Sequence, residues 1–108
     1  MRKTIKKFIP LLELLCNLEA KQRKTYLKTA KPDLLKFLSD IVHNFHSGVL
    51  KVSDEIVEKL RPYRNSIKKL TQKKLSLTGR KKILLSPQFF PKVIAILTPE
   101  LIKLVNND

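Results

Sequence analysis

The residues best suited to chemistry in this chain are the cations between residues 59 and 82. This stretch holds ten Lys or Arg and no Asp or Glu. Fixed cations on a folded surface neutralise the phosphates of a nucleic acid and release its condensed counterions. Ordinary charged surfaces mix both signs, so the stretch is better suited to a polyanion than to solubility alone. The pattern predicts phosphate contacts at Arg61, Arg64, Lys68, Lys69, Lys73, Lys74, Arg80, Lys81 and Lys82.

These residue types predict little reading of base sequence. Base-specific contacts need rigidly held Asn, Gln or Arg, whereas most of the nine are Lys, a point charge on a flexible stem. Aromatic side chains that stack on unpaired bases are few. Tyr63 falls on an apolar helix face, and Phe89 and Phe90 stand beside prolines, so we expect all three in a core or an interface.

The remaining reactive residue types do not predict a catalytic or metal site. Asp40, His43 and His46 are spaced three apart, and the two imidazoles would lie about 60° apart on a helix, close enough to share an ion. All three fall on the polar face, however, and no fourth ligand is near. Cys16 lies in an apolar run with no base nearby, which favours a small buried residue. We expect no enzyme activity, no metal and no cofactor.

Length and composition favour one folded, strongly basic domain. The chain has 108 residues, of which 43% are hydrophobic, enough for a modest core. Its formal charge of +14 attracts polyanions, nucleic acid first and an anionic membrane surface second. One cysteine excludes an internal disulfide. The start of the chain has the basic opening of a signal peptide, but Pro10 and Glu13 interrupt its apolar stretch, so we expect it to belong to the mature protein.

Charge is distributed unevenly along the chain. The net charge is +7 over residues 1–31, −3 over 32–58, +11 over 59–92 and −1 over 93–108. We predict a single helical domain over 1–108, with a basic part at 1–31, an acidic amphipathic helix at 32–48, a basic helical region at 53–85 and apolar C-terminal helices at 88–106.

The clearest predicted helix covers residues 32–48. Pro32 suits a first helical turn, Asp33 complements the positive helix end, and Gly48 is typical of the residue that follows a helix. Apolar residues fall within about 160° of arc, and Ser39 falls among the polar residues on the other side. The apolar arc consists of Leu34, Leu35, Phe37, Leu38, Ile41, Val42 and Phe45.

The next helix is expected to begin after Ser53, whose hydroxyl can cap the first turn. Pro62 should kink or split this helix, because it lacks an N–H donor and its ring collides with the preceding turn. Ser76 or Thr78 can cap a further short helix. Arg61, Arg64 and Lys68 would form a stripe within about 60°, away from an apolar seam. That seam is Ile56, Leu60, Tyr63, Ile67 and Leu70.

Shorter helices are expected at both ends of the chain. Two are predicted around residues 3–16 and 18–30, and the last one is predicted to begin at Thr98 and Pro99, a cap and first-turn pair. The run at 93–97 has strand-like composition, but we interpret it as helix. The sequence therefore predicts an all-α fold, a compact bundle of five or six short helices, one of them kinked or split at Pro62.

Several other functions fit the same residues. Lys68 and Lys69, followed after ten residues by Arg80, Lys81 and Lys82, have the spacing of a bipartite nuclear import signal. The basic, apolar start could lie on a membrane surface, although apolar residues surround that helix as burial in a core requires. The main rival to nucleic-acid binding is a helical protein-interaction module that binds an acidic partner surface.

The stretch S-D-E-I-V-E-K-L-R-P-Y-R-N-S-I-K-K-L-T-Q-K-K-L-S-L-T-G-R-K-K-I-L resembles a small basic protein encoded by Polinton/Maverick elements and adintoviruses. That family has a Ser at a helix start, an aromatic residue followed by a basic one, a basic pair before Leu, K-[KR]-x-S-[LI], and a basic triplet before I-L. Upstream, K-Q-R-K and the link to P-D-L-L extend the likeness to about residues 18–84. The matching positions are Ser53, Leu60, Tyr63, Arg64, Lys68, Lys69, Leu70, Lys73, Lys74, Ser76, Leu77, Arg80, Lys81, Lys82, Ile83 and Leu84.

The resemblance implies a virion core protein that coats and condenses double-stranded DNA inside a capsid. It places the protein in the nucleus of a host cell and in the virion interior. Its partners would be double-stranded DNA, a second copy of the chain or a capsid protein, with no small-molecule substrate. The chain departs from the family after this region, where S-P-Q-F-F-P replaces a Gly-Gly-Phe and a hydrophobic tail. The resemblance therefore does not extend to proteolytic processing at that point.

Overall fold

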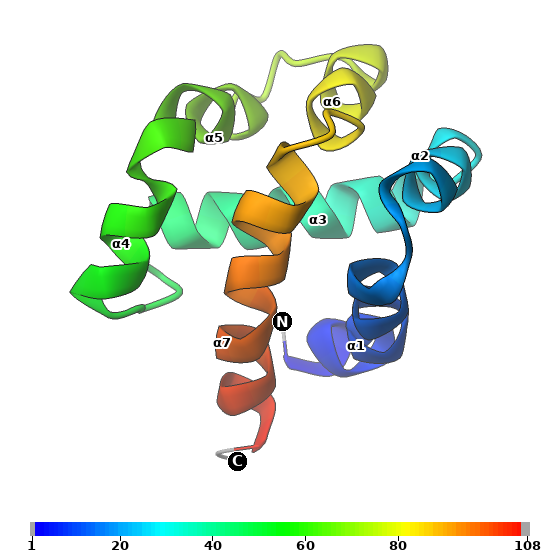
Figure 1. Cartoon of the computed structure of the whole chain (residues 1–108). Helices are drawn as coiled ribbons and strands as arrows, with labels where there is room; N and C mark the ends of the chain where they lie inside the picture. Colours follow the sequence, from blue (N-terminus) through cyan, green and yellow to red (C-terminus); the bar gives the residue numbers. More distant parts are fainter. Residues whose placement is uncertain (1, 107–108) are drawn as a thin grey trace.

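A computed structural model describes residues 2–106, with side chains from residue 3 onward, and it is helical without a strand in this range (Figure 1). The all-α prediction is confirmed. Counted with the segment broken at Pro62 as one, the helices in this described range number six. Their bounds are α1 (Arg2–Asn17), α2 (Ala20–Lys28), α3 (Pro32–His46), α4 (Asp54–Leu60), the 3-10 turn η1 (Arg61–Tyr63), α5 (Arg64–Leu70), α6 (Leu77–Leu84), the π-helical turn η2 (Phe90–Ile94) and α7 (Ala95–Asn106).

The central helix is α3, which crosses the middle of the molecule (Figure 1). It begins as predicted, with Pro32 as its first residue and Asp33 in its first turn. Gly48 follows its C-terminus with a φ of +82°, and its N–H donates to the carbonyl of Phe45 at 3.1 Å. Six of the seven residues in the predicted apolar arc are buried, and Phe45 is half-buried. Pro32, Asp33 and Gly48 therefore predicted the ends of α3, and the helical period predicted its core face.

Ser39 does not follow the predicted pattern. It is buried, and its hydroxyl donates to the carbonyl of Leu35 at 2.9 Å. The reason is that α3 is covered on more than one side, since it contacts both α5 and α6 and stacks Phe37 on Phe8 of α1 at 4.5 Å between ring centroids. A small hydroxyl that bonds to its own helix can be buried without an unsatisfied donor. The prediction that Ser39 lies on a solvated face was therefore wrong.

The remaining helices pack around α3 in two groups. In Figure 1, α5, α6 and α2 lie on one side of α3, and α1 lies on the other. Contacts join α5 to α6 and α6 to α2, and α1 packs against α7. The radius of gyration is 12.9 Å, about the value for a folded chain of this length.

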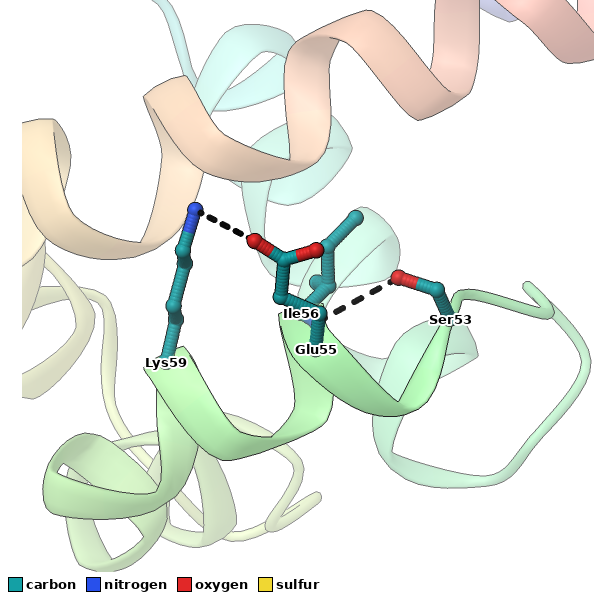
Figure 2. A network of polar contacts seen from close by, with 4 residues as sticks. All are labelled: Ser53, Glu55, Ile56 and Lys59. Carbon is teal, nitrogen blue, oxygen red and sulfur yellow. Dashed lines mark hydrogen bonds and ion pairs between the residues drawn. The ribbon is translucent and has the colours of Figure 1, made fainter.

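The predicted helix after Ser53 is split, as expected, by Pro62. The hydroxyl of Ser53 accepts the N–H of Ile56 at 3.4 Å, and Lys59 pairs with Glu55 at 3.5 Å on the same helix, α4 (Figure 2). Pro62 lies in the three-residue turn η1, because it cannot donate the hydrogen bond that a continuous helix needs.

The seam of this split helix faces the core, with Leu60, Ile67 and Leu70 buried and Ile56 and Tyr63 half-buried. The interruption therefore leaves the apolar face intact.

Of the two caps proposed for α6, the structure uses Ser76. Its hydroxyl accepts the N–H of Gly79 at 3.1 Å, whereas Thr78 lies inside the helix. This cap fixes the start of the helix that carries the basic triplet.

The predicted start of the last helix was wrong. Residues 93–97 are helical, as predicted, but α7 already begins at Ala95 and encloses Thr98 and Pro99. Thr98 is buried and donates its hydroxyl to the carbonyl of Ile94 at 2.8 Å, so it does not cap a helix. Burial of Leu97 and Leu101 explains the continuity, because core packing compensates for the hydrogen bond that Pro99 cannot donate.

Arg23 is a buried cation at the junction of α1 and α2. Its Nε donates to the carbonyl of Leu15 and its Nη2 to that of Leu18, each at 2.9 Å. The guanidinium also lies over the ring of Phe90, 4.7 Å from the centroid. The last turn of α1 has no basic residue of its own. Arg23 therefore supplies, from the next helix, the positive charge that favours a helix C-terminus.

Candidate nucleic-acid interface

The nine predicted phosphate contacts lie on four consecutive parts of the chain. Arg61 lies in η1; Arg64, Lys68 and Lys69 lie on α5; Lys73 and Lys74 lie in the loop that follows; and the basic triplet lies on α6. Six are exposed and free of ion pairs with described carboxylates, namely Arg64, Lys68, Lys69, Lys73, Lys74 and Lys82.

The fold brings a further basic helix, α2, into this region. Helix α6 contacts both α5 and α2 and lies between them in Figure 1, and α2 carries exposed Lys21, Lys24 and Lys28. These three belong to the basic segment 1–31, which the sequence analysis kept separate. The exposed cations on α2, α5, α6 and the α5–α6 loop are together called the basic surface. It consists of Lys21, Lys24, Lys28, Arg64, Lys68, Lys69, Lys73, Lys74 and Lys82.

Two members of the triplet have structural bonds. The ammonium of Lys81 donates to the backbone carbonyl of Lys28 at 3.1 Å, which joins α6 to the C-terminus of α2. Arg80 donates from Nε to the carbonyl of Leu75 at 3.5 Å, and both side chains are half-buried. The charges of Arg80 and Lys81 still add to the local positive potential, but some of their N–H donors are occupied by these bonds to backbone carbonyls. Lys82 is the member most available to a ligand.

Arg61 differs from the other predicted contacts because it pairs with Glu58. The two side chains are 2.5 Å apart between Nη2 and Oε1, and both are exposed. The 3-10 turn also separates Arg61 from the α5 helix, so the predicted stripe of Arg61, Arg64 and Lys68 is not one helical row.

Arg61 and Arg64 border a hollow of about 450 Å³. Its remaining lining consists of Phe45, His46, Val57, Leu60 and Ile67. We call it the Arg61 hollow, a partly apolar recess unlike the purely cationic basic surface.

Carboxylates do not neutralise the basic surface within the described residues. The ion pairs there join Lys59 to Glu55, Arg61 to Glu58 and Lys103 to Glu100. None involves a member of the basic surface, and none reaches from the acidic segment 32–58 beyond α4 and η1. The cations predicted to contact phosphate are therefore left mostly to solvent or to a ligand.

The other candidate residues form no site in the described part of the chain. Asp40, His43 and His46 are exposed, and no group of three or more His, Cys, Asp or Glu lies close enough to hold a metal ion in that part. Cys16 is half-buried, with Sγ 3.9 Å from Oγ1 of Thr98. Burial raises the pKa of the Cys16 thiol.

One functional candidate was missed by the sequence analysis. Phe89 and Phe90 are buried, as predicted, and Tyr63 is half-buried, but Tyr26 is 41% exposed. The helical period of α2 could have predicted this exposure. Arg23 and Leu27 define the buried face of the helix, and Tyr26 lies beside that face.

The basic N-terminal helix packs into the protein. Ile5, Leu12 and Leu15 of α1 are buried, while Phe8 and Leu11 are half-buried. No helix in the described range is both long and apolar enough to cross a membrane.

Searches against protein-family models, curated proteins and solved structures give no significant match to the chain. No relative therefore assigns a role to the basic surface, and its charge and geometry are what bear on function.

Proposed function

We propose that this protein binds double-stranded DNA without sequence preference and condenses it. The observation that carries the proposal is the basic surface, where nine exposed cations from three helices and one loop lack carboxylate partners within the described residues. The cations of such a surface repel one another, and bound phosphates reduce this repulsion. Binding also releases the counterions condensed on the DNA. Lysines predominate, which favours contact with the backbone over the bases.

The size of the protein suits a modest number of phosphate contacts. Its longest extent is 33 Å, close to one turn of B-DNA at about 34 Å. One face of the molecule therefore reaches a limited arc of the duplex, and about five of the nine cations can meet phosphates at once. With a net charge of +14, each bound copy also brings more positive charge than those contacts neutralise. Further duplexes are then attracted, as condensation requires.

The finer proposal is a virion core protein of a Polinton-like element or adintovirus, acting in the host nucleus and in the virion. It is supported by the resemblance over residues 18–84 and by the charge map, which is of the kind that packaged DNA requires. The resemblance and the fold are compatible, since Ser53 and Ser76 in that pattern both cap helices.

The salt dependence of DNA binding tests the proposal. Five phosphate contacts predict a slope of log K against log salt concentration of about −4 to −5. Replacing Arg64, Lys68 and Lys69 with Gln should weaken binding to every duplex sequence alike and make the slope shallower by about two or three. Fluorescence anisotropy with random duplexes at several salt concentrations measures both effects.

A matched control removes three charges that do not belong to the basic surface. Lys3 and Lys6 lie on α1, across α3 from α5 and α6 in Figure 1, and Lys103 lies in the last turn of α7. Replacing them with Gln should leave the slope almost unchanged. A slope near zero for the native protein would falsify DNA binding through this surface, and equal losses for the two triple variants would show that only net charge matters.

A second candidate function is binding to an acidic protein partner, and the Arg61 hollow favours it. The hollow combines apolar Phe45 and Val57 with Arg61, Arg64 and His46 at about 450 Å³, a composition that fits an acidic amphipathic helix. Titration with duplex DNA beside anionic vesicles separates the possibilities. Binding to DNA alone supports the proposal, binding to vesicles alone supports a membrane role, and binding to neither favours the protein partner.

A further inference from the structure

The surface around Tyr26 contains an exposed aromatic ring, which the basic surface lacks. Tyr26 lies on α2 and is 41% exposed, whereas the other six aromatic residues are buried or half-buried. Two hollows of about 500 and 510 Å³ adjoin its side chain.

The two hollows share Tyr26 and Thr29 and differ in the rest of their lining. The first lies among α1, α2 and the start of α3, with Phe8, Leu11 and Leu34 as its apolar part. The second lies along α2, where it is lined by groups that include Leu18 and the polar side chains of Gln22 and Thr25.

The charges around Tyr26 are mainly positive. Lys7 and Lys31 line the first hollow together with one carboxylate, Asp33, and Lys21 lines the second. Three lysines thus line the two hollows beside one accessible aromatic ring, with a single acid among them. A phosphate chain that passed this ring would meet a cation on each side of it.

We propose that this site binds unpaired nucleotides, with one base stacked on Tyr26 and the neighbouring phosphates held by Lys7, Lys21 and Lys31. Every base has an aromatic face, so stacking tolerates any sequence, and cations beside the ring supply the sequence-independent attraction to the strand. A paired base is not accessible to such a ring, because both of its faces are covered within the duplex. The site therefore selects single strands, unlike the rest of the basic surface, with which it shares Lys21. It rests on the proposed function only in taking nucleic acid as the ligand.

Tyrosine fluorescence tests the site directly. The chain has two tyrosines and no tryptophan, so the variant Tyr63→Phe leaves Tyr26 as its one tyrosine. Ten-nucleotide oligothymidine should quench this fluorescence, whereas an abasic oligomer of the same length and charge should bind with little quenching. Stacking of this kind predicts that Tyr26→Ala weakens oligothymidine binding about 5- to 150-fold, and Tyr26→Phe should retain it.

The outcomes separate this site from the duplex-binding proposal. Tyr26→Ala should not change binding to a 20-base-pair duplex or its salt slope, because the duplex is expected on the basic surface. Equal quenching by the abasic oligomer, or unchanged oligothymidine affinity in Tyr26→Ala, overturns the stacking site while leaving duplex binding in place. Absence of oligothymidine binding also overturns it. A loss of duplex affinity in Tyr26→Ala equal to the loss for oligothymidine contradicts selection of unpaired bases.

Discussion

Replacing the buried Arg23 should destabilise the protein far more than replacing its exposed neighbour Lys24. The guanidinium of Arg23 donates to two carbonyls at 2.9 Å at the end of α1 and covers the ring of Phe90. Arg23→Met fills similar space but leaves both carbonyls without this donor. Lys24→Met, by contrast, removes an exposed side chain. Both variants remove one positive charge, so relief of the overall repulsion is the same in each.

The magnitude follows from these contacts. Each hydrogen bond from a charged donor contributes about 1.5–3 kcal/mol, and the cation–π contact adds about 0.5–2 kcal/mol. Two effects offset part of that sum. The variant avoids the cost of dehydrating a guanidinium on folding, and water can hydrogen-bond to the less buried Leu18 carbonyl. We expect Arg23→Met to lower the free energy of unfolding by about 3 kcal/mol and Lys24→Met by less than about 0.5 kcal/mol. A loss of 3 kcal/mol is large against a total of about 5–15 kcal/mol.

Urea denaturation followed by far-UV circular dichroism, at one fixed salt concentration, measures both variants. Arg23→Lys is a useful third variant, because an ammonium keeps the charge but cannot reproduce the planar fork that serves two carbonyls. We expect its stability to fall between those of the native protein and Arg23→Met. If Arg23→Met and Lys24→Met differ by less than about 0.5 kcal/mol, Arg23 does not stabilise the junction of α1 and α2 as described.

Two further predictions concern the backbone and the thiol. Gly48 has a φ of +82°, and an added Cβ would meet no atom within 4 Å, so Gly48→Ala should cost only backbone strain, about 1 kcal/mol, and Gly48→Asn less, in the same urea assay. Burial raises the pKa of the Cys16 thiol, so iodoacetamide should alkylate native Cys16 at pH 8 more slowly than the unfolded chain. The same raised pKa means that the stability contributed by the neutral thiol is complete below its unfolded pKa and is lost as pH rises through the folded value. The free energy of unfolding should therefore fall above about pH 8.5 more steeply in the native protein than in Cys16→Ala, and identical pH profiles would contradict the shift.

Local rules in the sequence predicted much of the fold. Pro32, Gly48, Ser53 and Ser76 stand at helix ends where their backbone and side-chain chemistry predicts, and Pro62 splits a helix. These outcomes depend on hydrogen bonds within a few residues, so sequence neighbours suffice to predict them. The predictions failed where distant residues take part. Ser39 is buried because helices cover α3 on more than one side, and Thr98 lies inside α7 because its neighbours pack into the core.

The candidate interface divides in the same way. The sequence by itself determined that cations without acids are concentrated between residues 59 and 82, because charge is a property of each residue and survives any folding. Only the tertiary structure decided which of these charges remain available. It bound Lys81 to the backbone of α2, placed Lys28 beside α6 and buried Arg23, whereas the pair of Arg61 with Glu58 is a local contact between residues three apart. The physical reason is that hydrogen bonding and burial depend on distances between helices, which no local pattern of residues specifies.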